Sequence, residues 1–146
     1  MERFLSEKPI DMKQISPLTL AFVGDTVFDL LVRESIVCEA NRPTNDLHLL
    51  AVKKVKASAQ ANFAELLMPY FTDDELAVYK RGRNAKTAHI AKNATTRDYH
   101  MASGLEAVFG WLYLQGDMQR IKYLYNIIEG SFQNNEQNQN NQKECR

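Results

Sequence analysis

Two aspartates lie four residues apart in the apolar segment 20–31, "LAFVGDTVFDLL". At this spacing in a helix, Asp25 and Asp29 share one face, with Cβ atoms about 5–6 Å apart. Carboxylates this close repel each other, and burial makes their ionised forms costlier. A hard cation such as Mg²⁺ reverses that cost, because it takes oxygen ligands from one or two carboxylates. Asp25, which follows Gly24, is predicted to be a buried site acid; Asp29 is either a ligand or the partner of Arg33 in a helix ion pair.

A third carboxylate lies in a second apolar segment, "MASGLEAVFGWLYLQG", as Glu106. Gly104 precedes it and Gly110 follows it, and glycines permit another backbone to approach closely. A helix with Gly24 and Asp25 could therefore cross a helix with Glu106 and direct both acids at one point. The alternative for Glu106 alone is a boundary position or a salt bridge. Taken together, the two segments predict a metal site.

A basic segment without acids lies between these two motifs. Residues 80–97 hold six Lys or Arg, although the whole chain is neutral, with 18 basic and 18 acidic residues. Phosphoryl transfer requires cations for the substrate and acids for a metal, and the chain supplies both. The alternative is an ordinary solvated turn. The candidate phosphate contacts are Arg81, Arg83, Asn84 and Lys86, followed by Lys80 and Lys92.

The apolar residues recur at three- and four-residue spacing, which predicts a single all-α domain over residues 1–130. Predicted caps are Ser16, Thr44 or Asn45, Thr72 in a capping box, and Asp117. Residues 131–146 include nine Asn or Gln and are predicted to be a disordered tail. The expected helices span residues 16–36, 44–67, 72–83, 97–114 and 117–129.

The remaining composition argues against a membrane or a zinc protein. No apolar run approaches the roughly 20 residues needed to span a bilayer. Cys38 and Cys145 lack partners at metal-ligand spacing, and His48, His89 and His100 are widely separated. We expect a cytoplasmic protein.

The motifs, taken in order, resemble a known family. "LAFVGDTVFDLLVR" resembles the signature helix of the ribonuclease III family. "RGRNAK" followed by "YHMASGLEAVFGWLYLQG" resembles its short bacterial subfamily, Mini-ribonuclease III. The resemblance extends over about residues 16–129.

The resemblance implies an all-α, homodimeric endoribonuclease that cuts double-stranded RNA with Mg²⁺ and leaves 5′-phosphate and 3′-hydroxyl ends. It also implies maturation of the large-subunit (23S) ribosomal RNA precursor as the task. Asp25 and Glu106 match the metal-binding acids of the family, and Asp29 lies where relatives often have an acid. Ala21 and Ser103 stand where full-length members carry acids, so the alternative is a catalytically inactive RNA-binding module associated with ribosomal RNA.

Overall fold

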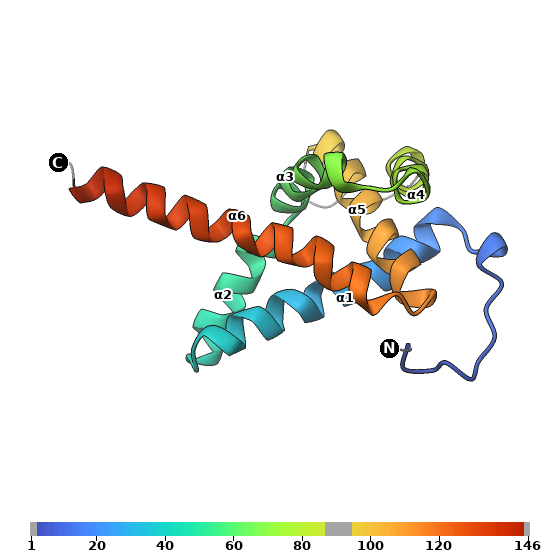
Figure 1. The fold of residues 1–146 in the computed structure, drawn as a ribbon, viewed down its shortest axis with the longest axis horizontal. Helices are drawn as coiled ribbons and strands as arrows, with labels where there is room; N and C mark the ends of the chain where they lie inside the picture. The colour runs from blue at the N-terminus through green and yellow to red at the C-terminus, as the bar shows by residue number, and fades with distance from the viewer. Residues whose placement is uncertain (1–2, 87–94, 145–146) are drawn as a thin grey trace.

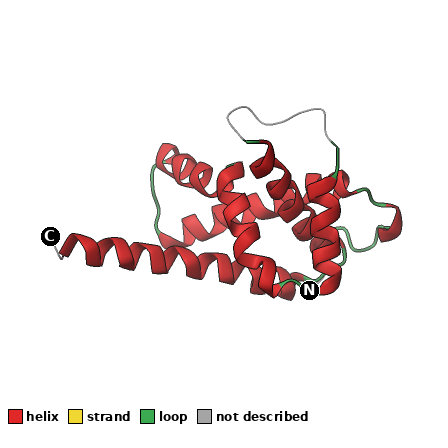
Figure 2. Ribbon diagram, turned by 90° about the horizontal axis from the view of Figure 1, so that it is seen from above, coloured by secondary structure: helices red, strands yellow, loops and turns green. Residues whose placement is uncertain are grey.

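The chain is helical throughout the part that the structure describes, as the ribbons in Figures 1 and 2 show. This computed structural model describes residues 3–86 and 95–144. The predicted all-α class is confirmed. The α-helices are α1 (Pro17–Glu39), α2 (Thr44–Val55), α3 (Ala57–Leu67), α4 (Asp73–Asn84), α5 (Thr96–Leu114) and α6 (Met118–Glu144), with short 3₁₀ helices at Met12–Gln14 and Met68–Tyr70.

Helix α5 is the centre of the fold, and it packs against α1, α3, α4 and α6. Ten of its residues are buried, including Leu105, Val108 and Phe109. A helix that is apolar on most of its circumference needs neighbours on most sides. The other helices therefore surround α5, and any side chain that α5 exposes must emerge between them.

An aromatic cluster in the core joins α1 to α3, α5 and α6. The ring of Phe28 lies 5.6 Å from that of Phe109 and 6.1 Å from those of Phe63 and Tyr125, measured between centroids. Aromatic pairs in this range stabilise beyond the area they bury. The cluster fixes α1, α3, α5 and α6 relative to one another.

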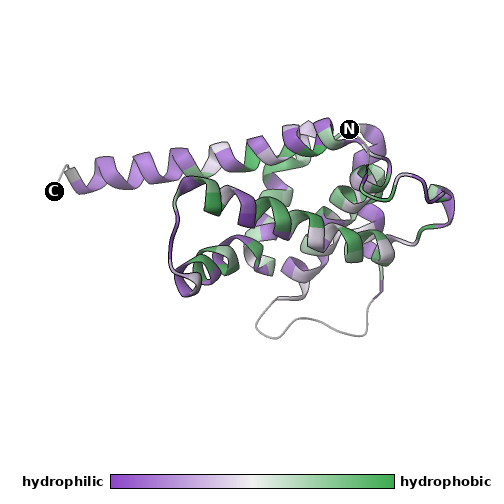
Figure 3. Ribbon diagram, turned by 90° about the horizontal axis from the view of Figure 1, so that it is seen from below, coloured by the Kyte–Doolittle hydropathy of each residue, from purple (hydrophilic) through white to green (hydrophobic). Residues whose placement is uncertain are grey.

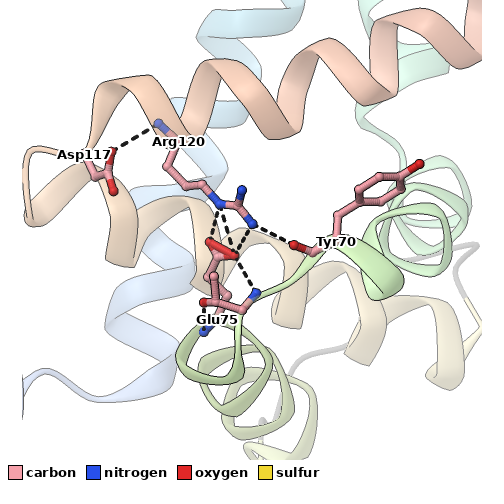
Figure 4. A network of polar contacts seen from close by, with 5 residues as sticks. Tyr70, Glu75, Asp117 and Arg120 are labelled. Carbon is pink, nitrogen blue, oxygen red and sulfur yellow. Dashed lines mark hydrogen bonds and ion pairs between the residues drawn. The ribbon is translucent and has the colours of Figure 1, made fainter.

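A buried ion pair links the start of α4 to the start of α6 (Figure 4). The guanidinium of Arg120 donates to both carboxylate oxygens of Glu75, with Nε–Oε2 and Nη2–Oε1 distances of 2.8 Å, and to the carbonyl of Tyr70. Glu75 also completes the predicted capping box with Thr72. Burial alone would raise the pKa of Glu75, but the hydrogen bonds from Arg120 and from the Thr72 backbone bring it below its ordinary value. This network closes one end of the bundle.

Most predicted helix ends are confirmed. Ser16 accepts the amide hydrogen of Thr19, and Asp117 accepts that of Arg120. Gly116 has a φ of 78°, in the left-handed region that glycine adopts without strain. The predicted cap at Thr44 or Asn45 is wrong, because α2 begins directly after Pro43 without a side-chain cap.

The single helix predicted over residues 44–67 is wrong as well. Lys56 is extended, with φ −60° and ψ 152°, and divides the segment into α2 and α3. The side-chain amide of Gln60 donates through Nε2 to the Val55 carbonyl at 2.8 Å. A side chain therefore takes the place of a helical hydrogen bond that the break removes.

The sequence predicted that the last helix ends at Gly130, but the helix continues beyond this residue. Helix α6 continues to Glu144, so residues 131–144 of the segment predicted to be disordered are helical in the structure. Phe132 anchors its continuation by packing on Phe63 at 5.3 Å. Beyond it, residues 133–143 are exposed, and this hydrophilic half projects past the other helices (Figures 1 and 3). The division of the chain at residue 130 stays a prediction.

Within residues 3–86 and 95–144, no helix combines the length and apolar character needed to cross a membrane.

Candidate active site

The crossing of α1 over α5 depends on two glycines. A Cβ atom on Gly24 would lie 1.6 Å from the carbonyl oxygen of Glu106, and one on Gly110 would lie 2.0 Å from that of Leu20. Contacts this short are impossible for a side chain, so both positions require glycine while the backbones stay where they are. The predicted close approach of the two motifs is confirmed.

This crossing brings the charge of Asp25 close enough to Glu106 to affect its ionisation. Burial, followed by the charge of Asp25, raises the pKa of Glu106 to about 8, against a hydrogen bond from Gln60 that lowers it. Asp25 itself is exposed, so the prediction of a buried acid is wrong for this residue. Partial desolvation and the charge of Asp29 still raise its pKa. The two helices therefore hold a repelling pair of carboxylates at the edge of the core.

Asp29 lies one turn beyond Asp25 and forms an ion pair. Its Oδ2 accepts from Nε of Arg33 at 2.9 Å, the alternative that the spacing allowed. A surface pair of this kind contributes little to stability. A metal-binding role for Asp29 stays a prediction.

Gln60 is a neighbour of Glu106 that the sequence analysis missed. Its residue is only 3 % exposed, and its Oε1 has no hydrogen-bond partner among the described residues. Its amide both donates to Val55 and lowers the pKa of Glu106. No signal in the sequence sets Gln60 apart, because Ser58, Asn62 and Glu65 are polar residues of the same stretch "ASAQANFAELL".

The acids provide only part of a metal coordination sphere. No three His, Cys, Asp or Glu side chains gather into a metal-binding group in the described part of the chain. Ala21 and Ser103, where further acids were considered, are buried at 6 % and 8 % exposure and supply no carboxylate. Mg²⁺ commonly binds through one or two carboxylates and keeps waters and substrate phosphates as its other ligands. Asp25 and Glu106 fit a magnesium site that substrate completes.

The predicted RNA contacts gather at the C-terminal end of α4. Lys80, Arg81 and Asn84 belong to its last turns and are exposed, and Lys86 follows the helix. Arg83 is half-buried, donates to Oδ1 of Asn84 at 3.1 Å and lies over the ring of Tyr79. Lys92 lies outside the described residues. The end of α4 thus forms a basic surface, although none of these residues is tested as an RNA contact.

The sequence and the fold both match known proteins. The family described as the ribonuclease III domain matches residues 18–117. A Mini-ribonuclease 3 of Clostridium tetani is 40 % identical over 131 residues, covering 88 % of this chain and 86 % of its own. One from Staphylococcus aureus is 44 % identical over 119 residues, covering 80 % and 89 %. A crystal structure of a Fusobacterium nucleatum protein, 27 % identical, superposes with a TM-score of 0.76 over 84 % of this chain and 98 % of that one.

Proposed function

The chain belongs to the ribonuclease III family, within the group of Mini-ribonuclease 3 proteins, and is an endoribonuclease; from this premise we propose that it cuts double-stranded RNA with Mg²⁺ held by Asp25 and Glu106. The observation that carries the proposal is the glycine-dependent crossing of α1 and α5, which brings these two acids together. Burial and the charge of Asp25 both raise the pKa of Glu106, an arrangement that is poor for stability but suited to binding a divalent cation.

The residues of the chain have separate tasks in this proposal. Glu106 and Asp25 bind the metal when both are ionised, and Gln60 orients the Glu106 carboxylate by hydrogen bonding. When bound, Mg²⁺ supplies positive charge that makes water more acidic and stabilises charge on phosphate. Asp29, which is paired with Arg33, either adds a carboxylate ligand to the metal or orients water beside Asp25. Hydrolysis then leaves 5′-phosphate and 3′-hydroxyl ends.

The basic surface at the end of α4 holds the duplex. A-form RNA is recognised mainly through its phosphates, 2′-hydroxyls and shape, because its deep major groove hides the bases. Exposed cations serve this purpose without reading sequence. We assign phosphate contacts to Arg81, Arg83, Lys86, Lys80 and Lys92, and a phosphate or sugar contact to Asn84.

An apolar surface on α1 supports a homodimer. Phe22 is 79 % exposed and Leu30 54 % exposed, and both border a hollow that Val27, Tyr113 and Ile121 also line. Large apolar side chains exposed together mark an interaction surface. Phe22 precedes Asp25 by three residues, so an interface here would border both active sites of a dimer. Phe22→Asp should convert the dimer to a monomer in sedimentation velocity, and a dimer that survives this change would place the interface elsewhere.

The proposed natural substrate is the precursor of large-subunit (23S) ribosomal RNA, matured in the cytoplasm. This assignment rests on the resemblance of the motifs to the short bacterial subfamily. Purified protein and precursor RNA, with the product ends mapped, would test it separately from cutting of duplex RNA in general.

A cleavage assay tests the central proposal. A long RNA duplex is incubated with the protein and Mg²⁺, or with a chelator, at several salt concentrations. Asp25→Asn and Glu106→Gln should abolish cutting and leave duplex binding largely intact, while Asp46→Asn, at an exposed acid on α2, should cut normally. Duplex binding without any Mg²⁺-dependent product from the unaltered protein would instead select an inactive RNA-binding module.

A further inference from the structure

A second hollow, lined in part by polar and charged side chains, lies between the end of α4 and the start of α5. It has a volume of about 490 Å³, and its lining includes Tyr79, Arg83, Arg97 and His100. His100 precedes Glu106 by six residues on α5, which is about 9 Å along the helix axis. The hollow is therefore close to the candidate active site but separate from its two acids.

Two polar atoms in this hollow have no hydrogen-bond partner among the described residues. They are the hydroxyl of Tyr79, whose residue is fully buried, and Nδ1 of His100. A buried polar atom without a partner costs stability, and phenylalanine would fill the space of Tyr79 without that cost. A ligand that accepts a hydrogen bond would give the Tyr79 hydroxyl the partner that it lacks among the described residues.

The charges around the tyrosine favour an anion. Burial raises the pKa of Tyr79, whereas the charges of Arg83 and Arg97 act to lower it, which places both cations near the hydroxyl. Glu65 is the acid in the lining, and it is already paired with Arg97, which also lies 3.9 Å from Asp98. Arg83 has no carboxylate partner among the described residues, and its guanidinium carbon lies 5.7 Å from the centroid of the Tyr79 ring.

The hollow is continuous with the basic surface of α4. Arg83, Asn84 and His100 also line an adjoining hollow that includes Lys86. The first turn of α5 opens beside it, and the start of a helix favours negative charge. An anion bound here would therefore lie next to the residues at the end of α4 that we assign as phosphate contacts.

We propose that this hollow binds a backbone phosphate of the RNA duplex away from the bond that is cut, with Arg83 supplying the charge and Tyr79 and His100 the hydrogen bonds. The inference rests on the proposed function and extends it, because it adds the buried Tyr79 and the partly buried His100, which charge patterning alone does not select. Arg97 contributes at longer range, since Glu65 holds its side chain.

Removing a single hydroxyl provides the sharpest test. Tyr79→Phe is made in the Glu106→Gln background, so that a fluorescent RNA duplex can be titrated without being cut, and Tyr123→Phe on α6 is the matched control. Tyr79→Phe should weaken the anisotropy-measured Kd about five- to tenfold, because a hydrogen bond to a charged group is lost. Its Tm should not fall, because the hydroxyl has no partner in the fold.

Two further variants cover the possibility that the tyrosine change disturbs packing. His100→Ala should weaken binding by several fold, whereas His48→Ala, at an exposed histidine on α2, should not. Arg83→Ala should also reduce the slope of log K against log salt by about 0.9, as loss of one phosphate contact predicts.

The outcomes separate this inference from the proposed function. If the unaltered protein cuts duplex RNA while Tyr79→Phe and His100→Ala bind like their controls, the hollow holds only water and the inference is overturned alone. If the unaltered protein neither binds nor cuts the duplex, both proposals fail. Weaker binding by both pocket variants, with both controls unchanged, supports the phosphate site.

Discussion

Replacing Glu106 with glutamine should stabilise the metal-free protein, by an amount that depends on pH. The folded protein raises the pKa of this carboxyl from 4.5 to about 8, first through burial and then through the charge of Asp25. The folded state therefore holds the Glu106 proton more tightly than the unfolded chain does. It follows that stability declines as the pH rises from about 4.5 to about 8, and that the loss is complete above this range.

The size of this effect follows from the two pKa values. A rise from 4.5 to about 8 corresponds to roughly 5 kcal/mol for holding the ionised carboxylate in the fold. Glutamine has nearly the same shape and cannot ionise. We therefore expect Glu106→Gln to increase the free energy of unfolding by about 3–5 kcal/mol at pH 9 and by less than about 1 kcal/mol at pH 4.5.

Urea unfolding provides the assay, with Trp111 as the reporter. This residue is the chain's single tryptophan and lies on α5, five residues after Glu106. The titrations are carried out with chelator, because a bound cation would offset the repulsion being measured. Glu34→Gln, at an exposed glutamate on α1, is the control and should change little at any pH.

The test compares the effect of Glu106→Gln on the free energy of unfolding at pH 4.5 with its effect at pH 9. Equal effects of Glu106→Gln at pH 4.5 and pH 9 would mean that the fold does not disfavour the ionised carboxylate. Destabilisation at pH 9 would mean that the negative charge is already compensated by groups other than a metal. Either outcome would refute the argument that the site is a repelling pair of acids.

Three more predictions address the helix crossing, the buried ion pair and the metal. Gly24→Ala should cost at least about 3 kcal/mol in unfolding experiments, because its Cβ would overlap the Glu106 carbonyl, whereas Gly130→Ala, which faces open space, should be neutral or stabilise by up to about 1 kcal/mol. Glu75→Gln should lower the free energy of unfolding by about 3 kcal/mol, because it removes the buried carboxylate that pairs with the partly exposed Arg120; a loss below about 1 kcal/mol would show that the pair is dispensable. Mg²⁺ at pH 8 should raise the Tm of the unaltered protein in a thermal scan but not that of Glu106→Gln, and equal shifts would place the ion elsewhere.

The features that could be predicted from the sequence depend on spacing within single segments. The helix period, the capping box at Thr72 and the glycines beside the two acids are all local patterns. These patterns predicted most of the helices. The glycines also indicated the α1–α5 crossing, because a residue without a side chain in an apolar helix permits another backbone to approach closely. The bond between Asp29 and Arg33 is local too, and the spacing included it as an alternative.

The features that could not be predicted depend on contacts between segments. No proline or glycine marks the break at Lys56, and the bond from Gln60 to Val55 exists only once that break has formed. The proximity of Gln60 to Glu106 requires α3 to pack on α5. The extension of α6 past Gly130 depends similarly on Phe132, whose contact with Phe63 joins residues far apart in the chain.

The exposure of Asp25 alters how the acid pair is understood. The two apolar segments predicted a buried acid in each, Asp25 and Glu106, but only Glu106 is substantially desolvated, and Asp25 is exposed. A cation arriving from solvent therefore meets the exposed carboxylate of Asp25 first. The carboxyl of Glu106 is more buried and is mostly protonated at neutral pH. Binding must release the proton of Glu106, so metal affinity should increase with pH up to about 8. Burial of the Glu106 carboxylate, and after it the charge of Asp25, weakens the fold, and a bound divalent cation offsets both costs. This explains why the crossing keeps both acids despite their cost to stability.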